Sequence, residues 1–141
     1  MPISGSGAAI DTSVAVAALD AAHAAHDACR EAVRERRPAL AGHAAFETHS
    51  VLTRLPGPQA VSTAIAADLI ARVFPDVAWL GSEDATALLR RLGVAGVSGG
   101  AVYDALVGEA ARVNGLVLLT RDRRAQRTYD LLGVDHEFVG P

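Results

Sequence analysis

Short apolar runs alternate with longer amphipathic segments along the chain, and this alternation restricts the possible folds more than any other feature. We predict strands at residues 8–10, 39–42, 77–80, 116–120 and 136–139. We predict helices at residues 23–36, 44–55, 62–74, 82–92, 101–113 and 124–132, and a further helix capped by Thr12 or Ser13. Strands that alternate with helices of ten or more residues form βαβ crossovers, and these build a parallel sheet with helices on both faces. The sequence therefore predicts an α/β fold.

The length and composition of the chain predict a single domain over residues 1–141. Half of the 141 residues are hydrophobic, which is enough for one substantial core. No segment is long and apolar enough to span a bilayer, and the first residues lack the features of a signal peptide, so we expect a soluble, cytoplasmic protein without membrane contact. Cys29 is the only cysteine, and we expect it to be a small buried filler and not part of a disulfide.

The basic residues are all arginines, and they gather in two clusters. The net charge is −3, which argues against a protein that coats nucleic acid nonspecifically. The cluster at residues 30–37 is expected to be a solvated helix face. The cluster at residues 121–127 keeps a functional interpretation, because arginine pairs with phosphate in a bidentate way.

Four acidic residues lack an ordinary structural explanation. Asp11 and Asp122 each follow a predicted strand, and functional groups of open parallel sheets gather beyond the carboxyl ends of the strands. Glu47 and Asp104 lie on helix faces among small or apolar residues, with no basic residue three or four positions away. In contrast, Asp68 precedes Arg72 by four residues and is explained as a surface ion pair.

These four carboxylates would repel one another at a single sheet edge unless protonation or a cation neutralised them. A cluster of oxygen ligands without cysteine or histidine suits Mg²⁺ or Mn²⁺, and does not suit zinc. Such a site leaves coordination positions for water and for a phosphate oxygen, which is the arrangement that hydrolyses phosphodiesters. The sequence thus predicts a metal-dependent hydrolytic site.

Four segments in order resemble the successive motifs of PIN-domain ribonucleases, in particular the VapC toxins of bacterial type II toxin–antitoxin pairs. The segments are IDTSV, FETHSVLTRLPGP, GGAVYDALVGEAAR and LLTRDRRAQRTYDLLGV, and they cover nearly the whole chain. The resemblance implies a PIN-like three-layer αβα sandwich with a central, mostly parallel sheet. It also implies a catalytic quartet of Asp11, Glu47, Asp104 and Asp122, a metal on Asp11, Asp104 and Asp122, and a supporting role for Thr120 in the metal network.

The resemblance implies an Mg²⁺- or Mn²⁺-dependent endoribonuclease that a cognate VapB antitoxin silences and that forms a homodimer. The proposed chemistry is attack of a metal-activated water on an RNA phosphodiester. Arg121, Arg123 and Arg124, beside the last acid, are candidates to hold the RNA backbone.

Two rival enzyme classes fail on single residues, and one alternative remains open. A haloacid-dehalogenase-type phosphatase needs a second acid where this chain has Ser13, and a phospho-receiver domain needs a lysine, of which there is none. The remaining alternative is a catalytically weak PIN-like protein that acts mainly by binding antitoxin or RNA. We interpret Phe46, Trp79 and Tyr103 as core or groove wall, so that RNA selection depends on shape and phosphate contacts.

Overall fold

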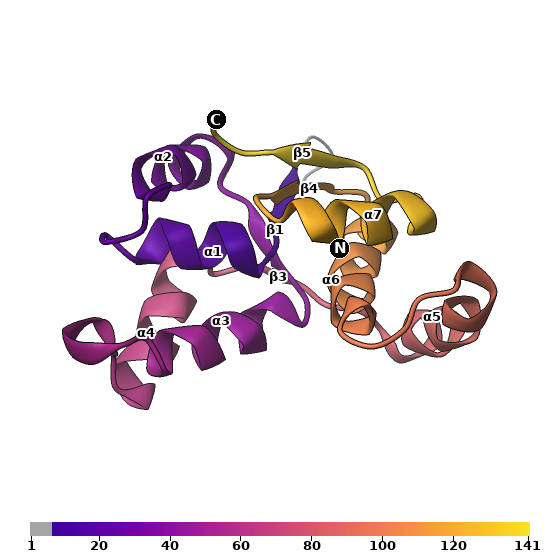
Figure 1. The fold of residues 1–141 in the computed structure, drawn as a ribbon, viewed down its shortest axis with the longest axis horizontal. Coiled ribbons are helices and arrows are strands. Elements are labelled where there is room, and N and C mark those ends of the chain that lie inside the picture. The colour runs from indigo at the N-terminus through magenta and orange to yellow at the C-terminus, as the bar shows by residue number, and fades with distance from the viewer. Residues whose placement is uncertain (1–6) are drawn as a thin grey trace.

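A five-stranded sheet forms the centre of the molecule in the computed structural model, which describes residues 7–141. The strands are β1 (Ala8–Ile10), β2 (Ala39–Ala41), β3 (Val77–Ala78), β4 (Val117–Thr120) and β5 (His136–Phe138). Their order is β3-β2-β1-β4-β5, and all four pairings are parallel. All carboxyl ends of the strands therefore lie at the same edge of the sheet, as the alternation of elements predicts (Figure 1).

Helices cover both faces of this sheet and complete the predicted three-layer αβα sandwich. One group contains α1 (Thr12–Leu19), α2 (His26–Arg36), α3 (Ala44–Thr53) and α4 (Thr63–Val73), with a short 3₁₀ helix, η1 (Gly57–Gln59), before α4. The other group contains α5 (Ser82–Ala95), α6 (Ala101–Val113) and α7 (Arg123–Leu132), on the right of Figure 1. None of the helices in residues 7–141 combines the length and apolarity that a membrane crossing requires.

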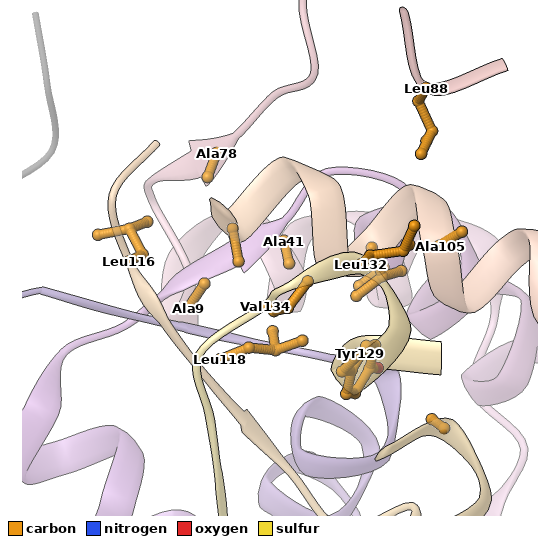
Figure 2. Close-up of a cluster of buried hydrophobic side chains, with 14 of the residues drawn as sticks. Ala9, Ala41, Ala78, Leu88, Ala105, Leu116, Leu118, Tyr129, Leu132 and Val134 are labelled. Carbon is orange, nitrogen blue, oxygen red and sulfur yellow. The ribbon is translucent and has the colours of Figure 1, made fainter. Parts of the chain in front are cut away.

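The core has two parts because successive strand residues point to opposite faces of the sheet. Ala9 and Leu118 face α5–α7, where they join a cluster that includes Tyr129 and Leu132 of α7 (Figure 2). The neighbouring residues of the same strands, such as Ile10, face α1–α4. Cys29 of α2 belongs to this second cluster and is fully buried, which confirms its interpretation as a filler.

Gly42 brings the start of α3 to the carboxyl edge of the sheet. Its φ is +49°, a conformation that side chains disfavour, and a Cβ there would lie 3.0 Å from the Cβ of Ala110 in α6. Only glycine fits this turn without displacing α6. The close turn follows β2 and brings the first turn of α3 to the start of α1, where Thr12 donates to Glu47.

Several predicted boundaries are wrong for local reasons. The cap of α1 is Asp11, not Thr12 or Ser13, since the carboxylate of Asp11 accepts from the backbone N–H of Val14. The helix predicted from residue 23 begins at His26, because the side chains of Asp20 and His23 accept backbone hydrogen bonds and form turns before it.

The ends of α5 and β3 also differ from prediction. Gly81, not Ser82, occupies the N-cap of α5, and the helix passes through Gly93 to end at Ala95. Its C-cap is Gly96, whose φ is +74°. The strand predicted at residues 77–80 is limited to its first two residues.

Candidate active site

Asp11 lies at the end of β1, where it is 4% exposed and carries several hydrogen bonds. Its Oδ1 accepts from the Ser13 hydroxyl and from the backbone N–H of Val14, and its Oδ2 accepts from the Tyr129 hydroxyl at 2.9 Å. The expectation that Asp11 has no ordinary structural role is therefore wrong, because it caps α1. Tyr129 is the distant partner that a buried carboxylate requires.

Burial and hydrogen bonding act in opposite directions on the pKa of Asp11. Burial raises this pKa, whereas the hydroxyls of Ser13, Thr120 and Tyr129 lower it. Burial and the adjacent charge of Asp11 raise the pKa of Tyr129 above its ordinary range. The Tyr129 hydroxyl consequently stays protonated and donates a hydrogen bond to Asp11.

Gly108 makes room for the Tyr129 ring against α6. A Cβ at position 108 would lie 2.9 Å from Cδ1 of Tyr129 and 3.1 Å from Cγ2 of Val134. Sequence analysis did not identify Tyr129. The available signal was its place on the buried face of α7 with Ala125 and Leu132, because a buried tyrosine hydroxyl needs a hydrogen-bond partner.

Asp122 caps α7, directly after β4. Its Oδ1 accepts from the backbone N–H groups of Arg124 at 3.0 Å and Ala125 at 3.2 Å. The fully buried Thr120 shapes this turn, because its Oγ1 accepts from the backbone N–H of Asp122 at 3.0 Å. Asp122, like Asp11, thus has an ordinary structural role that sequence analysis missed.

A serine hydroxyl joins the two strand ends. Ser13 donates to Asp11 and accepts from the backbone N–H of Arg121 at 2.8 Å. Because β1 and β4 are adjacent and parallel, this bridge fixes the turn that carries Asp122 beside the turn that carries Asp11. The predicted proximity of these two aspartates follows from the strand order.

Glu47 and Asp104 complete the group from the first turns of α3 and α6. Oε1 of Glu47 accepts from the Thr12 hydroxyl at 3.0 Å, which ties α3 to the start of α1. The pKa of Asp104 is raised to about 6, first by burial and then by the charges of Asp122, Glu47 and Asp11. Asp122, Glu47 and Asp11 therefore each lie close enough to Asp104 for their charges to raise its pKa.

The comparisons with known proteins show the family of the chain. The family model of the PIN domain matches residues 8–131, a span that contains all four acids. The chain belongs to the PIN-domain family. It is similar to Ribonuclease VapC27 of Mycobacterium tuberculosis, with 44% identity over 126 residues that cover 89% of this chain and 92% of the relative. It is also similar to Ribonuclease VapC40 of the same species, with 43% identity over 130 residues, 92% of this chain and 96% of the relative. The resemblance to VapC ribonucleases is confirmed.

The acids of this PIN domain supply only oxygen donors, which fits a hard divalent cation such as Mg²⁺ or Mn²⁺. Within residues 7–141, no three Asp, Glu, His or Cys side chains converge tightly enough to hold a metal by themselves. Mg²⁺ in proteins is commonly held by one or two carboxylates and keeps several waters, so an open group of carboxylates is compatible with it. That Asp11, Asp104 and Asp122 hold such an ion stays a prediction.

The three arginines beside Asp122 differ in the contacts that their guanidinium groups make. Arg121 donates to the carbonyl of Val139, and its guanidinium lies 5.1 Å from the ring centroid of Phe138. The guanidinium of Arg123 stacks over the same ring at 4.0 Å. Arg124 is exposed, and its charge lowers the pKa of Asp104. Arg124 is thus the arginine whose charge acts on the carboxylates, whereas β5 and the C-terminal residues hold the other two.

Three aromatic side chains at this end of the PIN domain are exposed, so they are not part of the core, whereas the interpretation of Tyr103 as groove wall fits its place in the lining of a hollow beside Glu47. Phe46 is 63% exposed, Trp79 54% and Tyr103 52%. They follow the turns at the sheet edge, where no further element covers them. Their rings form a row in which His43 stacks on Tyr103 with centroids 5.6 Å apart, and Phe46 tilts toward Trp79 at 5.8 Å.

Proposed function

We propose that this PIN domain is an Mg²⁺- or Mn²⁺-dependent endoribonuclease and the toxin of a VapBC-type toxin–antitoxin pair. One observation carries the proposal: acids from the starts of four helices lie at one sheet edge, and the charges of three of them add to burial in raising the pKa of the fourth, Asp104. The names of the relatives, which are ribonucleases, give the substrate class.

In this proposal, the side chains of the site have different roles. Asp11, Asp104 and Asp122 hold the cation, which when bound lowers the pKa of water and stabilises charge on phosphate oxygens. Glu47 accepts from Thr12 through Oε1 and keeps the capacity to accept a further hydrogen bond, so it would orient a water beside the ion. Tyr129 and Ser13 keep Asp11 oriented through their hydroxyls.

RNA and an antitoxin are the proposed partners. Arg124 is placed to contact an RNA phosphate that approaches Asp104, because its exposed charge already acts on that side chain. We further propose that the chain functions as a single domain, as a homodimer, and under the control of a VapB-type antitoxin, since the VapC relatives match nearly their whole length.

The direct test is cleavage of a labelled RNA by the purified protein with Mg²⁺ or Mn²⁺. We expect EDTA and Asp11→Asn each to abolish cleavage. Asparagine retains a capping oxygen, so α1 should stay folded. Asp68→Asn, an exposed carboxylate paired with Arg72, is the matched control and should cleave normally.

Two outcomes would contradict the proposal. Cleavage that survives both EDTA and Asp11→Asn would show that another site or a contaminant is responsible. A folded protein that binds RNA or its antitoxin but cleaves no RNA with either metal would favour the alternative of a PIN-like binding protein.

A further inference from the structure

We propose that a hollow beside the carboxylates is a subsite for one unpaired nucleotide of the RNA, next to the phosphodiester that is cut. The inference rests on the proposed function and specifies its substrate. The hollow lies between α1, α3 and α6 and has a volume of about 250 Å³. Its lining includes Thr12, His43, Glu47, Ser50, Arg54 and Tyr103.

The hollow is continuous with the carboxylate group. Glu47 belongs to both, and the Thr12 hydroxyl that binds Glu47 at 3.0 Å also lines the hollow. Tyr103 directly precedes Asp104 in α6. A nucleotide in the hollow would therefore be the immediate neighbour of a phosphodiester bound at the acids.

A pre-ordered aromatic surface forms one wall. The ring of His43 stacks on Tyr103, with centroids 5.6 Å apart and planes 21° apart, and Tyr103 is 52% exposed. Both rings line the hollow, and about half of the Tyr103 surface remains exposed to a ligand there. Nucleobases stack on such rings regardless of sequence, because every base has a π face.

Polar side chains extend from this wall along α3. Glu47, Ser50 and Arg54 are spaced by three and four residues, so they share one helix face. Ser50 and Arg54 are exposed. Within residues 7–141, the guanidinium of Arg54 forms no salt bridge. A hydroxyl and a guanidinium in this row can bind the sugar and phosphate of a nucleotide whose base lies on Tyr103.

The lining favours RNA over a peptide. Peptides that dock in grooves insert aliphatic or aromatic anchors between apolar walls. Within residues 7–141, the lining of this hollow has one aliphatic side chain, Val51, among hydroxyl, carboxylate, guanidinium and ring groups. Base stacking also requires an unpaired base, so the expected substrate is a single-stranded segment or loop.

The test compares variants of Tyr103 in their affinity for a fluorescein-labelled single-stranded RNA in EDTA, where no cleavage is expected. Tyr103→Leu removes the ring and should weaken binding by roughly ten- to a hundredfold, whereas Tyr103→Phe keeps the ring and should bind like the wild type. Arg54→Ala should weaken binding and reduce its salt dependence. Arg90→Ala, an exposed arginine of α5 outside the hollow, is the control and should change neither.

A second measurement uses the unaltered protein, so that it does not depend on how a variant folds. A 2-aminopurine base placed at successive positions of the RNA should lose fluorescence at one position when it stacks on Tyr103. Quenching at one position supports the subsite, and no quenching at any position overturns it.

The outcomes separate this inference from the nuclease proposal. If the protein cleaves RNA with metal and Tyr103→Leu changes neither affinity nor KM, the subsite is wrong and the nuclease stands. If binding depends on Tyr103 but no metal supports cleavage, the subsite stands and the nuclease fails. If Tyr103→Leu leaves RNA affinity intact but prevents antitoxin binding or dissociates a dimer, the hollow is a protein interface and the inference is overturned.

Discussion

Asp104→Asn should stabilise the metal-free protein. The pKa of Asp104 lies at about 6, against an ordinary value of 3.8, because burial and the charges of Asp122, Glu47 and Asp11 disfavour its ionised form. No hydrogen bond contributes to that pKa, so asparagine removes the charge with little loss of contact. The substitution therefore removes the cost of burying this charge together with its repulsion by the other three acids.

The sign and size of the effect follow from the pKa. Well below pH 3.8, Asp104 is protonated and uncharged in both the folded and the unfolded chain, so it does not lower the free energy of unfolding through its charge. As the pH rises from 3.8 to about 6, the unfolded chain ionises first, so the free energy of unfolding falls, and above this range the loss is complete. A pKa difference of this size corresponds to roughly 3 kcal/mol, which we reduce to about 1–2 kcal/mol because Asp104 is only half-buried and solvent screens its charge.

The assay is urea unfolding in EDTA, followed by circular dichroism, at about pH 4 and about pH 8. Asp104→Asn should be about 1–2 kcal/mol more stable than the wild type at the higher pH, equivalent to a Tm increase of roughly 3–8 °C, and close to it at the lower pH. Asp68→Asn should show no such gain, because Asp68 pairs with Arg72 at the exposed surface. A variant that is less stable at the higher pH, or equally stabilised at both, would refute the crowding of the acids.

Three further results are expected from the same structure. Mn²⁺ should raise the Tm of the wild type more than that of Asp104→Asn, because a ligand that binds only the folded state stabilises it; equal increases would mean that the ion binds elsewhere. Tyr129→Phe should lower the free energy of unfolding by about 1–3 kcal/mol, since Oδ2 of the buried Asp11 loses its donor, and unchanged urea unfolding would contradict that bond. Glu109, 2% exposed, receives hydrogen bonds from Arg91 and Arg112, so Glu109→Gln should cost about 2–3 kcal/mol at neutral pH. The hydrogen bond from Arg112 holds the pKa of Glu109 below its ordinary value. The cost of Glu109→Gln should therefore shrink as the pH falls below the ordinary pKa of a glutamate, and a cost that does not change with pH would exclude the charge of Glu109 as the cause of the cost.

The order of elements could be predicted from the sequence because each element carries a complete local signal. Residues 101–113 are helical as predicted, since Gly99 and Gly100 precede a continuous helical pattern and Asn114 and Gly115 follow it. The parallel sheet follows from the length of the crossovers, which are too long for hairpins. These features depend on neighbours in the chain and need no knowledge of the tertiary structure.

Errors arose where distant groups or competing local bonds decide the outcome. The Ala-rich segment before His26 has high helix propensity, but hydrogen bonds from Asp20 and His23 to the backbone form turns there. Gly93 lies inside α5 because its backbone stays helical, and the helix ends at Gly96, which adopts a positive φ. The Tyr129–Asp11 bond spans 118 residues, so no local pattern could reveal it.

The position of the four acids explains why a chain without metal can tolerate them. Asp11 and Asp122 are the N-caps of α1 and α7, and Glu47 and Asp104 lie in the first turns of α3 and α6. Each carboxylate therefore sits at the positive end of a helix dipole, which offsets part of the repulsion that the group creates.

Glu83 and Asp84, in the first turn of α5, have the same favourable position without belonging to the quartet. Placement at a helix N-terminus thus cannot separate a functional acid from a structural one. What distinguishes the quartet is that parallel strands bring four such helix starts to one edge, where burial and then the charges of the other three acids raise the pKa of Asp104 to about 6. The dipoles therefore compensate the charges only in part, and a divalent cation would neutralise what is left.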